Sequence, residues 1–116
     1  MKNSRRKGAA GERELASKLR KYGYTDARRG QQFCGANGDA DVVGLPDVHI
    51  EVKRVEKLNL YDAMAQSVHD ARAGETPVVM HRKNNCDWLV TMRFDDFMRM
   101  YGGSRVETPG EIRKKL

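Results

Sequence analysis

Cysteine, long apolar runs and nucleotide-binding motifs are scarce or absent in this chain. Its 116 residues include two cysteines, Cys34 and Cys86, which form no pair with metal-ligand spacing, so neither a zinc module nor a disulfide-stapled secreted domain is expected. No stretch approaches the roughly 20 apolar residues that cross a bilayer. The basic N-terminus leads into no apolar run of a secretory signal, and the phosphate-cradling pattern GxxxxGK[ST] is missing. We therefore expect a cytoplasmic protein with no membrane contact and no nucleotide cofactor.

Positive charge is concentrated at one end of the chain. Residues 1–30 carry ten Lys or Arg against three acids, whereas residues 31–116 are almost neutral. This asymmetry favours a polyanionic partner, most simply nucleic acid, although a solvated basic tail would give the same pattern. The candidate phosphate contacts are Arg5, Arg6, Lys7, Arg28 and Arg29.

The apolar periodicity predicts a single α/β domain over residues 1–116. Helical spacing predicts helices over 9–22, from Asn59 as N-cap to a stop at Gly74, and over 94–101. Strands are expected over 24–28, 41–44, 48–55, 77–82 and 88–92, with a glycine-rich loop at 30–38. The order αβββαββα implies a mixed central sheet flanked by helices. Residues 1–7 are expected to form a basic arm and 104–116 a flexible tail.

One acid lies on the apolar stripe of the first predicted helix. Glu12 precedes Leu15, Ala16 and Leu19 at helical spacing, whereas Glu14 points the other way and is expected to be ordinary. A carboxylate on a buried face costs several kcal/mol unless it is paired or bound to a metal. Glu12 is therefore either an ion-pair partner at the edge of the stripe or part of a site.

Acids and a lysine also converge on the strand predicted over 48–55. His49, Glu51 and Lys53 share one of its faces, and a short hairpin would place Asp41 beside Glu51. Two carboxylates with the Val52 carbonyl would suit Mg²⁺, for which Mn²⁺ commonly substitutes. His49 is expected to be a neighbour of this site, and Asp39 competes with Asp41. A cross-strand ion pair on a solvated face is the alternative.

These residues resemble a known catalytic pattern. Asp41, followed after a short interval by Ile50-Glu51-Val52-Lys53, is similar to the PD-(D/E)xK nuclease motif. Lys7-Gly8-Ala9-Ala10-Gly11-Glu12-Arg13-Glu14-Leu15 resembles the first helix of archaeal-type Holliday junction resolvases, and the segment 38–44 resembles their second element. The likeness is closest to small phage and prophage endonucleases and covers roughly residues 5–100.

The resemblance implies a restriction-endonuclease-like core and a metal-dependent DNA endonuclease in a bacterial or phage-infected cell. It implies that Glu12, Asp41 and Glu51, with Val52, hold the metal, that Lys53 assists catalysis, and that Arg28 or Arg29 contacts the phosphate backbone. It also implies a homodimer that cuts one strand per subunit. Gln66 corresponds to a glutamine present in some branches, unless it only faces solvent.

The predicted function is therefore a structure-selective DNA endonuclease similar to Holliday junction resolvases. A nicking or end-processing nuclease acting on linear or flapped DNA is one alternative. A non-catalytic nucleic-acid-binding module is another, but a pure binder would gain nothing from gathering acids that repel phosphate.

Overall fold

Five strands and three helices alternate along the described part of the chain. The computed structural model describes residues 4–31 and 40–103, and for residues 4–7 the backbone alone. The elements are α1 (Ser4–Lys21), β1 (Arg28–Arg29), β2 (Val42–Val43), β3 (Val48–Arg54), α2 (Leu60–Asp70), β4 (Thr76–Arg82), β5 (Leu89–Met92) and α3 (Phe94–Gly103). The predicted order αβββαββα is confirmed.

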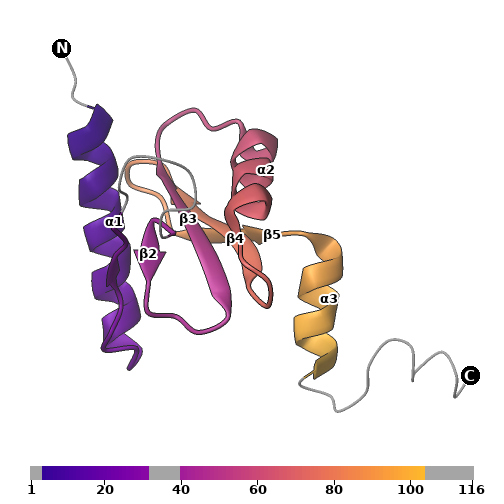
Figure 1. The fold of residues 1–116 in the computed structure, drawn as a ribbon. Coiled ribbons are helices and arrows are strands. Elements are labelled where there is room, and N and C mark those ends of the chain that lie inside the picture. The colour runs from indigo at the N-terminus through magenta and orange to yellow at the C-terminus, as the bar shows by residue number, and fades with distance from the viewer. Residues whose placement is uncertain (1–3, 32–39, 104–116) are drawn as a thin grey trace, which may run out of the picture.

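The strands form one mixed sheet in the order β1-β2-β3-β4-β5. β3 and β4 run parallel and are joined by α2, while the other neighbours are antiparallel. α1 and α2 lie on opposite sides of the sheet (Figure 1). This is the α/β arrangement expected of a restriction-endonuclease-like core.

The core lies between α1 and the sheet. Leu15 and Ala16 of α1 are buried in one cluster with apolar side chains of β2, β3 and β4, namely Val42, Ile50, Val52, Val78 and Met80. Because side chains alternate along a strand, His49, Glu51 and Lys53 point to the opposite face of β3, where α2 packs. Small residues let α2 lie close to that face: Ser67 is fully buried and its hydroxyl donates to the Val78 carbonyl at 3.0 Å.

Three predicted boundaries are wrong, each for a local reason. α1 begins at Ser4 and not at residue 9, so residues 4–7 of the predicted arm continue the helix. The predicted strand over 24–28 is mostly turn, because Gly23 has a φ of 100° and the Ala27 N–H donates to the Tyr24 carbonyl. α2 ends at Asp70, although its predicted N-cap Asn59 does accept the Asp62 N–H.

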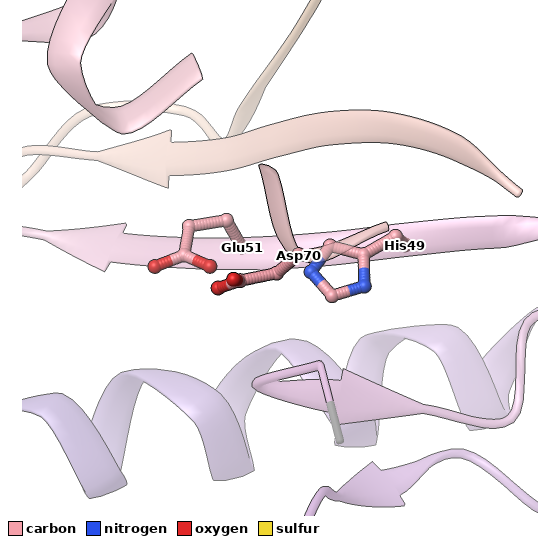
Figure 2. Close-up of side chains that lie close together, drawn as sticks. All are labelled: His49, Glu51 and Asp70. Carbon is pink, nitrogen blue, oxygen red and sulfur yellow. The ribbon is translucent and has the colours of Figure 1, made fainter. Parts of the chain in front are cut away.

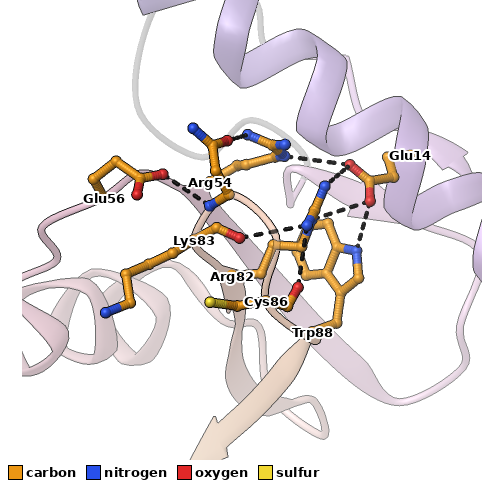
Figure 3. Close-up of polar contacts among 8 residues, drawn as sticks. Glu14, Arg54, Glu56, Arg82, Lys83, Cys86 and Trp88 are labelled. Carbon is orange, nitrogen blue, oxygen red and sulfur yellow. Dashed lines mark hydrogen bonds and ion pairs between the residues drawn. The ribbon is translucent and has the colours of Figure 1, made fainter.

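Glu14 fixes α1 against the ends of the sheet strands. Its carboxylate accepts from Arg54 at 3.3 Å and from the Trp88 indole at 3.1 Å, and it pairs with Arg82 at 3.1 Å (Figure 3). Burial raises the pKa of Glu14, but the hydrogen bonds from Trp88 and Arg82 outweigh it and lower the pKa. The expectation that Glu14 is ordinary is therefore wrong.

Gly11 allows α1 to approach β3 closely. A Cβ at this position would lie 2.9 Å from the Cβ of Arg54, closer than real side chains approach. The glycine and the Glu14 ion pairs together set the height of α1 above the sheet, and thus the position of Glu12.

Among the helices in the described ranges, none is long and apolar enough to cross a bilayer.

Candidate metal centre

The β2–β3 hairpin brings Asp41 to Glu51, as predicted. Val42 pairs with Ile50, and the Asp41 N–H donates to the Ile50 carbonyl at 3.0 Å. The Val52 N–H donates to Asp41 Oδ2 at 2.8 Å, so the carboxylate takes the place of a strand partner just before β2 begins. The N–H and C=O of one strand residue point to the same edge, so the Val52 carbonyl is directed to this edge as well.

Glu51 has a pKa well above the ordinary value of a glutamate. Its side chain is 12% exposed, and Lys53 Nζ lies 3.9 Å from Glu51 Oε2. Burial and the charge of Asp41 raise the pKa of Glu51 to about 7, against the opposing charge of Lys53. Burial and the neighbouring acids thus disfavour the ionised form of Glu51 more than the nearby lysine favours it, and a bound cation would relieve that cost.

Glu12 lies in the same electrostatic cluster but has a protein partner. Arg29 Nε donates to Glu12 Oε1 at 2.8 Å. Burial raises the pKa of Glu12, as does the charge of Asp41, while the Arg29 hydrogen bond lowers it. The structure therefore brings Glu12, Asp41, Glu51 and Lys53 together at one edge of β3, and it adds Arg29 as a guanidinium at the rim.

The remaining predicted residues are more scattered. Arg28 is exposed, and its Nη1 donates to the Asp26 carbonyl at 3.0 Å. Gln66 is also exposed, and its side-chain amide donates to Asp70 Oδ2 at 2.6 Å. Arg5, Arg6 and Lys7 belong to the first turns of α1, where the structure describes no side chains, and Asp39 lies outside the described residues.

Asp70 was not predicted as a site residue. It is the last residue of α2 and lies beside His49 and Glu51 (Figure 2). One donor atom from each of these three residues falls within 4.8 Å of the others. Part of this group was predictable from the sequence, because His49 and Glu51 share a strand face. The end of a crossover helix, however, has no fixed register to the strand before it.

The donor set fits a hard divalent cation. Two carboxylates from adjacent strands and a backbone carbonyl supply oxygen ligands, which suit Mg²⁺ and Mn²⁺ better than zinc. Lys53 is 38% exposed, so its ammonium is reachable by a phosphate in solvent. The arrangement combines a candidate cation site with a cationic side chain two residues along the strand, a combination that suits metal-assisted phosphodiester hydrolysis.

Comparison with known proteins gives one match. A family model described as phage putative PDDEXK endonuclease matches residues 3–111. The match includes every described element and the whole of the predicted motif. No curated protein and no solved structure matches the chain.

Proposed function

This chain belongs to the phage PDDEXK endonuclease family, and from that premise we propose that it is a Mg²⁺-dependent DNA endonuclease with a preference for branched DNA. PDDEXK nucleases act on nucleic acid with divalent metal ions. The observation that carries the residue assignment is the Asp41–Glu51 pair, in which burial and then the charge of Asp41 raise the pKa of Glu51 to about 7.

In this proposal Asp41, Glu51 and the Val52 carbonyl hold the metal ion. The bound ion would lower the pKa of a water and neutralise charge on the phosphate. The Val52 N–H orients the Asp41 carboxylate through its Oδ2. Lys53 lies next to Glu51 and is placed to hold the attacking water or the scissile phosphate.

Glu12 acts through Arg29 in the metal-free protein. The 2.8 Å ion pair holds the guanidinium beside the carboxylates while its side chain remains 45% exposed. An exposed guanidinium next to a cation site suits a phosphate of the substrate. On phosphate binding, Arg29 would turn from Glu12 to the DNA and leave Glu12 to the metal.

The preference for branched DNA and the homodimer belong together, because two cuts across a junction need two active sites. The edge strand β5 and helix α3 present an apolar surface that suits a second copy. Leu89, Val90 and Phe94 are more than half exposed, and Phe97 stacks on Tyr101 along α3, which stands off the sheet in Figure 1. Sedimentation of the full chain should give a dimer, and Phe94→Ser should give a monomer; a monomeric parent protein would contradict the proposal.

The cleavage experiment compares an end-labelled four-way junction with a linear duplex of the same arms. Each is incubated with the protein in Mg²⁺ or in EDTA, beside Glu51→Ala and Lys53→Ala. Symmetric paired cuts in the junction alone, dependent on Mg²⁺ and on both residues, are expected. Cutting of both substrates would leave a nuclease without the branch preference. Binding without cutting under any metal would contradict the proposal that the chain is an enzyme and would favour a nucleic-acid-binding module.

A further inference from the structure

A second group of metal-ligating side chains lies on the α2 side of β3. His49 and Glu51 project from the same face of the strand, and Asp70 reaches them from the end of α2, with its side chain drawn between theirs (Figure 2). One donor atom of each lies within 4.8 Å of the others. The cluster is not part of the PD-(D/E)xK pattern, which includes only Glu51 of the three.

His49 has an unmatched nitrogen in this cluster. The residue is 4% exposed, and its Nε2 has no hydrogen-bond partner among the described residues. Its other nitrogen, Nδ1, lies 3.7 Å from Glu75 Oε1. A buried polar atom without a partner is costly and calls for an explanation. A metal-bound histidine characteristically donates its other ring N–H to a carboxylate; the Glu75 carboxylate lies on that side of His49, at a distance longer than a hydrogen bond.

Asp70 is oriented by its own neighbours. Gln66 donates to Oδ2 at 2.6 Å, and His69 Nδ1 lies 3.0 Å from Oδ1. A cavity of about 80 Å³ adjoins the group and is lined in part by His49, Asp70 and Glu75. A carboxylate that is held in place, next to a space of this size, is suited to a cation and its water ligands.

We propose that His49 Nε2, Glu51 and Asp70 bind a divalent transition-metal ion of the Mn²⁺ or Zn²⁺ kind. An imidazole ligand favours such ions over Mg²⁺, which prefers oxygen alone. The proposal shares Glu51 with the proposed catalytic site and otherwise rests on residues outside it. Glu51 would then be a ligand of both cations.

Arg72 provides the competing explanation. Arg72 also lines the cavity, and a guanidinium that reached the carboxylates would balance their charge without a metal. In that arrangement His49 would be a buried neighbour of Asp70 and nothing more. The two explanations differ in whether an imidazole nitrogen ever contacts a bound ion.

The test is electron paramagnetic resonance of Mn²⁺ added to the full chain in excess Mg²⁺, with electron spin echo detection of imidazole nitrogen. The parent protein should show Mn²⁺ coupled to one imidazole, and nitrogen-15 labelling of histidine should change that coupling. The coupling should vanish in His49→Gln, fall with Asp70→Asn and persist in His69→Gln and His81→Gln. Thermal unfolding in EDTA checks that each variant is folded.

The outcomes separate this proposal from the proposed function. Asp41→Asn should abolish cleavage but keep the imidazole coupling, because Asp41 is not one of the three ligands. A parent protein that cuts DNA but shows no imidazole coupling would overturn the second site alone. Coupling lost in His69→Gln and kept in His49→Gln would assign the ligand to the exposed histidine and overturn the proposal as well. Imidazole coupling without DNA cleavage would support the second metal site and contradict the proposed nuclease function.

Discussion

Replacing Glu51 with glutamine should stabilise the metal-free protein, and only at neutral and alkaline pH. Burial and the charge of Asp41 raise the pKa of Glu51 from its ordinary value of 4.5 to about 7. Between these two values the folded protein holds a proton that the unfolded chain releases. The free energy of unfolding therefore falls as pH rises through this window. The full cost is reached above pH 7 and is absent below pH 4.5.

The size of the effect follows from the width of the window. Each unit of pKa difference corresponds to 1.36 kcal/mol, so the raised pKa of Glu51 costs about 3 kcal/mol at pH 8. Glu51→Gln removes the titrating group and keeps the shape of the side chain. Urea unfolding in EDTA should give parent and variant the same free energy of unfolding at pH 4.5. At pH 8 the variant should be more stable by about 3 kcal/mol.

Glu14→Gln is the matched control, because the pKa of Glu14 is lowered and not raised. Its effect on the free energy of unfolding should therefore have the opposite sign. Its ion pairs contribute stability above the ordinary pKa, and that contribution is lost as pH falls through the lowered value. Glu14→Gln should therefore be less stable than the parent at pH 8, with the difference shrinking in acid. Equal stability of parent and Glu51→Gln at pH 8 would refute the charge crowding on which the metal site depends.

Three further predictions concern catalysis, DNA contact and packing. Lys53→Ala should lower the cleavage rate by at least about 100-fold while the Kd for DNA changes only severalfold, and a variant that cuts normally would exclude a catalytic role. Arg28→Ala should weaken binding to every sequence alike and reduce the slope of log K against log salt by about 0.9; a loss confined to one sequence would indicate base readout. Gly11→Ala should destabilise the fold by about 1–3 kcal/mol in urea unfolding, whereas Gly8→Ala, with nothing within 4 Å of the new Cβ, should stabilise the helix by up to about 1 kcal/mol. Equal effects of the two glycine variants would argue against close packing of α1.

The sequence was sufficient for the element order and for the Asp41–Glu51 pair, because both depend on local rules. The alternation of β3 fixes which residues share a face, and a short hairpin fixes which residue lies opposite Glu51. The boundary of α1 was missed since Gly8 and the basic residues before it gave no apolar stripe. The helix nevertheless continues through them to Ser4.

Asp70 and Glu14 were missed for a different reason. Both contact residues that are far away in the sequence. Asp70 lies beside side chains of β3, and Glu14 contacts Arg82 and Trp88. Their partners depend on how α1 and α2 sit on the sheet, which no short-range pattern specifies. Gly11 and Ser67 set those distances by being small, and small residues carry little signal in a single sequence.

The two sites have a common electrostatic basis. The pKa of Glu51 is raised by Asp41, Asp70 and Glu12 in addition to burial, and Lys53 alone opposes them among the causes of the shift. A cation at either proposed site would relieve the same repulsion, so binding of the first ion should ionise Glu51 and release a proton near pH 7. Once Glu51 is ionised it attracts a second ion at the other proposed site, while the two ions repel each other directly. The order of filling should then follow ligand chemistry, with Mg²⁺ at the oxygen ligands of Asp41 and a transition-metal ion at His49.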